Sequence, residues 1–321
     1  LIGGGGYVGS VLTEALLKKN YLVTVYDLFI YGENVFKNHK NLKIIKGDIR
    51  NLKLLESSIK GNDILIHLAC ISNDPSFELD PKLGKSINYD SFFPLVKTSK
   101  ENGVHRFIYA SSSSVYGIKD KIDVNENDEC NPITDYSKFK LECEKILLDN
   151  NSNDFACSII RPATVCGYSP RQRLDLVVNI LTNLAYHKRK IKVFGGEQLR
   201  PNIHIQDMVN SYILLIESDI KKVNNEIFNV GFENLKVKEI AQMVKKVVGD
   251  DVTLETTPTD DNRSYHISAK KIMNHLNFKP SFTIEDGVLE LVNKFKSKKL
   301  TDTLNNEFYF NIKRMQNIKL T

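Results

Sequence analysis

The chain has 321 residues, of which 41% are hydrophobic and 26% charged, and its formal net charge is +5 at pH 7. This composition is typical of a folded, water-soluble protein, and the length allows one large domain or two moderate ones. No apolar run reaches the roughly 20 residues of a membrane span, and no basic run is interleaved with aromatic residues. We therefore expect neither a membrane nor a nucleic acid as a partner.

The five cysteines form no C-x-x-C pair and show no pairing with histidine. An odd, unpatterned set favours free thiols in a reducing compartment over disulfides or zinc. We therefore expect a cytoplasmic protein without a metal site. The sequence starts inside a strand-like segment and without methionine, so we also expect that the true N-terminus is missing.

The beginning of the chain predicts a dinucleotide site. Leu1-Ile2 is typical of the end of a buried strand, Gly3-Gly4-Gly5-Gly6-Tyr7-Val8-Gly9 of a tight turn, and residues 10–17 of an amphipathic helix. The glycines fit both G-x-x-G-x-x-G and G-x-G-x-x-G. Glycines let the backbone approach a pyrophosphate closely, and the N-terminus of the helix offers it N–H groups and partial positive charge.

A carboxylate follows at the distance that such a site requires. Residues 22–27 form a β-rich run that ends in Asp27, and no basic residue stands beside it in residues 28–30. An acid here binds the ribose hydroxyls of adenosine and repels a 2′-phosphate. We therefore expect NAD, not NADP, as the cofactor. The alternative is a glycine turn followed by an unrelated surface aspartate.

The rest of the first half alternates strands with helices. We expect strands at 42–49, 63–70, 104–110 and 155–160, and helices at 52–59, 86–101 and 136–148. This alternation predicts an α/β fold with a doubly wound parallel sheet of the Rossmann type. Ligands of such sheets bind beyond the carboxyl ends of the strands, where the polar clusters of this half lie.

The second half has a looser rhythm. We expect helices at 174–186, 207–217, 237–248, 268–276 and 284–296, and strands at 192–194, 227–230 and 252–256. We interpret residues 1–165 as an NAD-binding domain that carries the catalytic residues. Residues 166–321 are then mainly a smaller mixed α/β cap that binds the substrate, with some segments returning to the first domain. The tail from residue 298 either packs on the body or stays mobile.

Three residues have the chemistry of a hydroxyl-oxidising site. Tyr136 and Lys140 are four residues apart and share one helix face. A free tyrosine has a pKa of about 10, and a fixed ammonium nearby, like a positive nicotinamide ring, would lower the pKa by stabilising the phenolate. Tyr136 could then act as a general base. Ser112, at the end of the preceding strand, can donate a hydrogen bond to the same substrate oxygen. In isolation the Tyr-x-x-x-Lys pattern would indicate only a solvated helix face.

With these motifs the chain resembles the extended short-chain dehydrogenase/reductase family, specifically its nucleotide-sugar epimerases and dehydratases. The resemblance covers nearly the whole chain. It rests on the glycine motif, Asp27, Tyr136…Lys140, Gly47-Asp48-Ile49, His67-Leu68-Ala69, Ser111-Ser112-Ser113-Ser114-Val115-Tyr116-Gly117, Arg161-Pro162-Ala163-Thr164-Val165-Cys166-Gly167 and Arg200-Pro201-Asn202-Ile203-His204-Ile205.

The resemblance implies NAD as cofactor and a nucleotide sugar as substrate. The cofactor-binding residues that it implies are Gly3, Gly6, Tyr7, Val8, Asp27, Asp48, Ile49, Leu68, Ala69, Tyr136, Lys140, Pro162, Thr164 and Val165. The substrate-binding residues that we expect are Ser72, Ser113, Arg171, Asn179, Arg200 and Arg263. Among these, Arg200, with Arg263, should meet the substrate diphosphate. Arg171 and its neighbour Arg173 could either grip a phosphate or line a surface.

Departures from the family pattern reduce the number of reactions that we expect. Dehydratases similar to this chain carry an acid pair where it has Ser113-Ser114, and enzymes that epimerise carbons 3 and 5 use cysteine at the position of Ser113. Cys166 replaces a common aromatic residue. We therefore expect hydride transfer at one carbinol, most simply C4, in an epimerase or a C4 dehydrogenase. The alternatives are a 4,6-dehydratase, which is a lyase, and a non-catalytic NAD-binding regulatory protein.

Two expectations concern packing. The resemblance implies a homodimer that pairs the helices at 86–101 and 136–148 with those of a second chain. The residues that we expect at this interface are Phe92, Phe93, Val96, Phe139, Cys143 and Ile146. His67 and His204 lie in apolar runs and have no metal-ligand spacing, so we interpret them as core residues with satisfied nitrogens.

Overall fold

The computed structural model describes residues 1–119, 121–259, 266–318 and 320. Its main sheet is parallel throughout, as the alternation of strands and helices predicts. Ile2 joins the sheet by pairing with Tyr26 on one side and His67 on the other. The order across the sheet is β2 (Leu42–Lys46), β1 (Val23–Asp27), Ile2, β3 (Ile64–His67), β4 (Arg106–Ala110), β5 (Ala156–Pro162) and β9 (Glu226–Val230).

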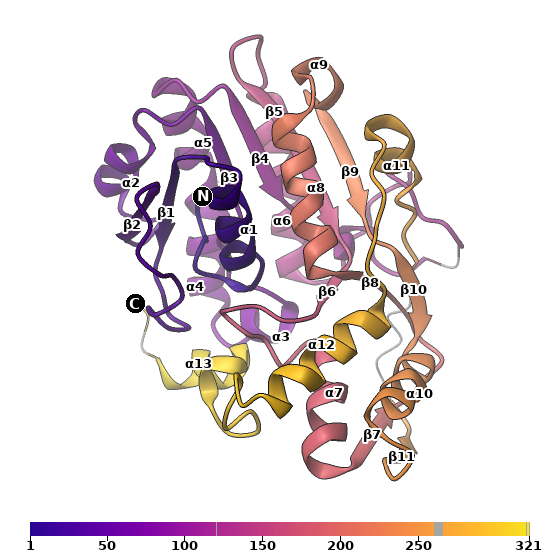
Figure 1. Cartoon of the computed structure of the whole chain (residues 1–321). Helices are drawn as coiled ribbons and strands as arrows, with labels where there is room; N and C mark the ends of the chain where they lie inside the picture. Colours follow the sequence, from indigo (N-terminus) through magenta and orange to yellow (C-terminus); the bar gives the residue numbers. More distant parts are fainter. Residues whose placement is uncertain (120, 260–265, 319, 321) are drawn as a thin grey trace.

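Helices cover both faces of this sheet (Figure 1). One layer contains α1 (Tyr7–Lys18), α8 (Ile205–Glu217) and α11 (Lys270–Leu276), and the other contains α2 (Leu52–Ile59), α5 (Phe92–Glu101) and α6 (Asp135–Asp149). The residues of β4 explain the two layers. Ile108 packs into the hydrophobic core on one face of the sheet, and Phe107 and Tyr109 pack into the core on the other face. A strand that is apolar on both faces needs a helix layer on each side.

The helix expected at 86–101 is interrupted. The chain forms α4 (Pro81–Lys85), a π-helical turn at Ser86–Asp90 and then α5. Pro94 in the first turn of α5 has no N–H to donate back, which allows the break. Within the π turn, the Asn88 amide hydrogen-bonds both backbone groups of Ile71, at 2.8 and 3.0 Å. The break therefore fixes the loop that follows β3.

The second half of the chain contributes to both parts of the molecule. β9, α8 and α11 pack with the main sheet, whereas α7 (Val177–Lys188), α10 (Val237–Val248) and α12 (Ile284–Lys296) pack with two small sheets around a second core. Val165 and Ile203 of one small sheet also pack into the core of the main sheet. The small sheets pair β6 (Thr164–Cys166), β8 (Leu199–His204) and β10 (Glu233–Lys236), and β7 (Lys190–Phe194) with β11 (Thr253–Thr257). The sequence predicts no strand at β6 or β10, and for β8 it indicates only an apolar run around His204.

The C-terminal tail packs back on the body. A 3₁₀ turn at Glu307–Tyr309 leads into α13 (Asn311–Asn317), which lies beside the short helix α3 (Asp74–Phe77) (Figure 1). Leu174 N–H donates to the carbonyl of Tyr309 at 2.8 Å, and Arg314 Nε donates to the carbonyl of Ile30 at 2.6 Å. The tail thus joins two loops at the carboxyl ends of the strands. Across the described residues, no helix is long and apolar enough to span a bilayer.

Candidate active site

The glycine turn forms a cradle that side chains would fill. Gly3 has φ +82°, and a Cβ there would lie 2.4 Å from the backbone nitrogen of Ala69. A Cβ on Gly9 would lie 2.3 Å from the carbonyl oxygen of Gly3. α1 begins at Tyr7 with Gly6 as N-cap, and no side chain caps it. The turn therefore leaves room for an anion at the helix N-terminus, which fits a dinucleotide diphosphate.

Asp27 ends β1 beside this turn. Its carboxylate accepts hydrogen bonds from Gly5 N–H at 2.9 Å and Phe29 N–H at 2.7 Å. Burial raises the pKa of Asp27, and these backbone donors oppose the rise by stabilising the charged form. The carboxylate is therefore held in one orientation at the edge of the cradle.

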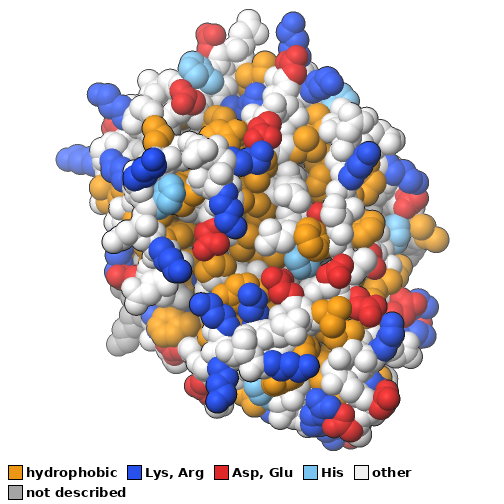
Figure 2. All heavy atoms as spheres, viewed as in Figure 1, with side chains coloured by type: hydrophobic (Ala, Val, Ile, Leu, Met, Phe, Trp, Pro, Cys, Tyr) orange, Lys and Arg blue, Asp and Glu red, His pale blue; other side chains and the backbone are white. Residues whose placement is uncertain are grey.

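A cavity of about 380 Å³ runs from the cradle across the carboxyl ends of the strands. On the face of the molecule seen in Figure 2, hydrophobic side chains gather near the centre, and charged side chains lie both among them and around them. The expected site residues in the cavity wall are Gly3, Gly6, Tyr7, Val8, Asp27, Asp48, Ile49, Leu68, Ala69, Ser72, Ser112, Ser113, Tyr136, Lys140, Pro162, Thr164, Val165 and Arg171.

The three expected catalytic side chains converge on this cavity. Ser112 follows β4, and its Oγ lies 2.8 Å from Ser114 Oγ. Tyr136 lies in the first turn of α6, where a capping box between Thr134 and Ser137 fixes the start of the helix. Lys140, one turn later, has its Nζ 5.9 Å from the centre of the Tyr136 ring.

The pKa of Tyr136 differs from our expectation. Burial raises this pKa well above its ordinary value, and the opposing cation is Arg173 rather than Lys140. The ammonium of Lys140 instead donates to the carbonyl of Ala110 at 2.7 Å. Desolvation of the phenolate therefore outweighs the nearby positive charge.

The wall also holds an acid that the sequence analysis did not select. Asp74, at the start of α3, lines the cavity and accepts a hydrogen bond from Thr134 Oγ1. Its negative charge is one of the causes that raise the pKa of Tyr136. Ser113 also lines the cavity and is only 3% exposed. A carboxylate is thus present near Tyr136, although not at Ser113-Ser114.

A buried polar network supports this serine-rich strand end. Glu144 of α6 forms a two-point ion pair with Arg161 of β5, at 3.0 and 2.6 Å, and also accepts from Ser111 Oγ. Arg161 donates further to Tyr116 Oη at 2.8 Å, and Tyr116 donates to Asn229 Oδ1 at 2.8 Å. The network ties α6, β5 and β9 to the turn after Ser112. Arg161 belongs to a motif that is visible in the sequence, whereas no sequence pattern indicates Glu144.

Both histidines are buried, as expected, but only one has its ring nitrogens engaged. His204 Nδ1 accepts from Gln206 N–H at 3.2 Å, and its Nε2 lies 3.3 Å from Glu290. His67 stacks on Tyr109, and among the described residues its Nδ1 has no hydrogen-bond partner. Burial and the charge of Lys140 lower the pKa of His67 to about 3, so the ring is neutral.

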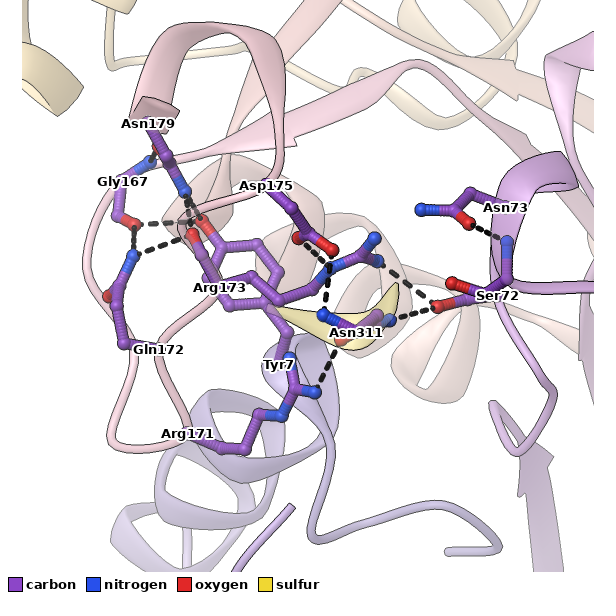
Figure 3. A network of polar contacts seen from close by, with 11 residues as sticks. Tyr7, Ser72, Asn73, Gly167, Arg171, Gln172, Arg173, Asp175, Asn179 and Asn311 are labelled. Carbon is purple, nitrogen blue, oxygen red and sulfur yellow. Dashed lines mark hydrogen bonds and ion pairs between the residues drawn. The ribbon is translucent and has the colours of Figure 1, made fainter. Parts of the chain in front are cut away.

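Two expected substrate residues, Asn179 and Arg200, lie outside the residues that line the cavity. Asn179 is fully buried and supports the glycine turn, donating to Tyr7 Oη at 3.0 Å and accepting from Gly167 N–H at 3.1 Å (Figure 3). Its amide is therefore occupied within the protein, which corrects our expectation of a substrate contact. Arg200 lies on β8, outside the residues that line the cavity. Arg263 lies outside the described residues.

The fold and this site define a Rossmann-type protein of the short-chain dehydrogenase/reductase class, with a dinucleotide cradle beside a Ser-Tyr-Lys set. Residues 1–231 match the NAD dependent epimerase/dehydratase family. Because the match covers most of the chain, the protein belongs to that family, and it is an NAD-dependent enzyme of the extended type.

Individual relatives agree with this assignment. UDP-glucose 4-epimerase of Lactobacillus helveticus is 26% identical over 313 residues, which cover 90% of this chain and 94% of that protein. A crystal structure of UDP-glucose 4-epimerase from Thermotoga maritima with UDP-glucose superposes with a TM-score of 0.85 at 24% identity, over 93% of this chain and 98% of that one. The dTDP-glucose 4,6-dehydratase DesIV of Streptomyces venezuelae reaches 0.83 at 20% identity, over 93% and 96%. The two structures show that the fold is shared.

Proposed function

We propose that the protein oxidises one carbinol of a nucleotide sugar, at C4, and returns the hydride to the opposite face, which makes it a 4-epimerase. The observation that carries this proposal is the convergence of Ser112, Tyr136 and Lys140 on the cavity that also contains the glycine cradle. The name of the Lactobacillus helveticus relative supports a UDP-sugar as the substrate. Release of the keto sugar, as by a C4 dehydrogenase, is the other outcome of the same first step.

Tyr136, Ser112 and Lys140 have separate roles in this proposal. Tyr136 accepts the proton of the sugar hydroxyl, and Ser112 holds the same oxygen by a hydrogen bond. When bound, NAD supplies the hydride acceptor and a positive ring that favours the phenolate. This charge offsets the effect of burial, which raises the pKa of Tyr136. Lys140, held by the Ala110 carbonyl, orients the nicotinamide ribose.

The remaining assignments divide the cavity into two parts. We assign the cofactor to the cradle, Asp27 and the loop of Leu68 and Ala69, with Asp48 and Ile49 at the adenine and Pro162, Thr164 and Val165 at the nicotinamide. The substrate contacts that we assign are Ser72, Ser113, Arg171, Arg200 and Arg263. We include Arg200 because the cap must supply positive charge for the second diphosphate, although Arg200 lies on β8, outside the residues that line the cavity.

Asp74 supports a second candidate. A 4,6-dehydratase needs an acid that protonates the leaving hydroxyl, and Asp74 is a carboxyl group in the wall of the cavity that holds Tyr136. The likeness in fold to a dTDP-glucose 4,6-dehydratase is compatible with this reaction. Elimination of water would make the enzyme a lyase.

Product analysis with deuterium at sugar C4 separates these reactions. We expect the label to remain in a sugar with inverted C4, because the hydride returns internally. Label on free NADH would indicate a dehydrogenase. A product lighter by the mass of one water would indicate that Asp74 supports elimination, and this result would reject the epimerase proposal.

We also propose a cytoplasmic homodimer. Phe93 of α5 is 51% exposed, and Phe139 and Ile146 of α6 are partly exposed, so these three can meet a second copy. Phe92, Val96 and Cys143 are fully buried in the chain's own core, and their expected place at the interface is wrong. Light scattering at micromolar concentration should give the mass of two chains for the wild type and of one chain for Phe93→Glu.

A further inference from the structure

Two arginines from the loop between β6 and α7, Arg171 and Arg173, lie in the cavity wall. A carboxylate neutralises the charge of only one of them. Arg173 forms an ion pair with Asp175, with Nε 2.8 Å from Oδ1. Among the described residues, no carboxylate lies within ion-pair distance of Arg171. Arg171 is nevertheless only 4% exposed, and its guanidinium lies 3.7 Å from the centre of the Tyr31 ring. A buried cation without an anion is costly, so this arrangement suits a ligand that carries negative charge.

Donor groups of both arginines remain unused. Nε of Arg171 and Nη2 of Arg173 are buried, and among the described residues neither has a hydrogen-bond partner. Leaving such donors unsatisfied costs free energy, and charged donors cost more than neutral ones. Two unsatisfied guanidinium N–H groups in one cavity wall therefore point to an acceptor that arrives with a ligand.

The C-terminal tail supplies the remaining contact of Arg171. Arg171 Nη2 donates to Asn311 Oδ1 at 2.6 Å (Figure 3). Asn311 is 1% exposed, and its Nδ2 donates to Ser72 Oγ at 2.9 Å, while its backbone N–H donates to Asp175 Oδ2 at 2.9 Å. Arg173 Nη1 donates to the same Ser72 Oγ at 3.1 Å. One asparagine thus links both arginines to the loop after β3.

We propose that the C-terminal segment is part of the ligand site, in which Asn311 is a positioning residue and Arg171 binds a phosphoryl group of the ligand. The proposal rests on the proposed function, because it assumes that the cavity holds nucleotides. An amide accepts the hydrogen bond of Arg171 but leaves its positive charge available, which a carboxylate would not. Guanidinium groups match phosphate oxygens well in charge and geometry.

The diphosphate of the nucleotide sugar, to which Arg171 is assigned above, is one source of this phosphoryl group. The diphosphate of the dinucleotide is the other source, because Arg171 packs on Tyr31 in the loop after β1, and β1 ends in Asp27 at the cradle. Separate titrations with the two ligands distinguish them.

The decisive variant is Asn311→Asp, which keeps the size of the side chain and places a carboxylate on Arg171. The full chain should be titrated by calorimetry with NAD and, separately, with UDP. We expect the affinity for the ligand that uses Arg171 to fall about 10- to 100-fold, the scale of one charge-assisted hydrogen bond. Asn311→Ala, which removes the acceptor without adding charge, should cause a smaller loss. Gln316→Glu puts the same charge on an exposed position of α13 and should change neither affinity.

Each outcome decides the proposal. A loss in the NAD titration alone supports the cofactor diphosphate as the ligand, and a loss in the UDP titration alone supports the substrate diphosphate. Unchanged affinities in both, with a higher melting temperature from the new ion pair, would show that Asn311 only fastens the tail and would overturn the proposal. If wild-type protein binds neither NAD nor UDP, the proposed function itself is rejected, and this inference is rejected with it.

Discussion

The two sides of the cavity hold their ligand-facing groups in opposite ways. The cradle is made of backbone from one short stretch, residues 3–9, and needs glycine because a Cβ on Gly9 would lie 2.3 Å from a carbonyl oxygen. The arginine side is made of side chains from distant segments, with Ser72, Arg171 and Asn311 joined only by tertiary contacts. The cradle is thus a local feature of the sequence, whereas the arginine side exists only once the whole chain has folded.

The largest effect on the catalytic rate should come from Tyr136, which lines the same cavity as both regions. Tyr136→Phe keeps the ring but removes the proton acceptor, so the rate should fall by about 10²–10⁴-fold. Steady-state turnover of a UDP-sugar measures the loss, and NAD and UDP should bind with unchanged affinity. Near-normal turnover would mean that another group takes the proton.

The next largest effect concerns the free energy of unfolding. It should show whether the buried pair of Glu144 and Arg161 stabilises the serine-rich end of β4. Glu144→Ala leaves Arg161 buried without its carboxylate, since the side chains of the pair are only 2% and 4% exposed. Removal of one partner from a buried pair costs roughly 3–5 kcal/mol. Urea denaturation should show this as a lower free energy of unfolding.

Glu142→Ala is the matched control on the same helix. Glu142 pairs with Lys145 at the surface, with its side chain 47% exposed. Such pairs contribute about 0–1 kcal/mol. Equal losses for the two variants would indicate that the buried network adds nothing beyond the helix itself.

The same contrast explains what the sequence could predict. The cradle, Asp27 and the Tyr136–Lys140 spacing are local patterns, and the parallel sheet follows from apolar runs such as β3 and β4. The apolar run around His204 indicates the end of β8, but Arg200 and Asn202 interrupt the apolar pattern before it, so the sequence predicts no complete strand there. The break before α5 was missed because the apolar spacing continues through Asn88, whose role depends on the loop after β3.

Contacts across long sequence separations could not be predicted. Asn311 lies 239 residues from Ser72, and no local pattern links them. Our prediction of a substrate contact for Asn179 is wrong because the burial of Asn179 against Tyr7 is visible only in the folded chain. The pKa of Tyr136 depends on burial and on Arg173, neither of which is encoded in the four-residue spacing.

Arg200→Ala tests whether the cap supplies charge to the substrate. If Arg200 binds the substrate diphosphate, loss of its charge-assisted hydrogen bonds, at roughly 1.5–3 kcal/mol each, should weaken UDP-sugar binding by about one to two orders of magnitude. NAD affinity should stay nearly unchanged because the cradle is intact. Calorimetric titration with each ligand measures both, and equal losses would indicate a folding role for Arg200.

The smallest effect concerns which cation acts on the phenol. A general base works only when deprotonated, so activity rises as the pH passes through its pKa, and a variant that raises this pKa shifts the rise to higher pH. Lys140→Met should produce such a shift if the ammonium acts on Tyr136 once ligands are bound. Arg173→Met should produce such a shift if the positive charge of Arg173, which opposes the rise in the pKa of Tyr136, also acts during turnover. A shift of about one pH unit corresponds to about 1.4 kcal/mol. The pH profile of kcat should be measured for both variants with saturating ligands. It shows whether Lys140, on the same helix, or Arg173, on the arginine side, lowers the pKa of Tyr136. A profile that moves in neither variant would leave burial and the bound cofactor as the determinants of this pKa, and would contradict the role of both cations.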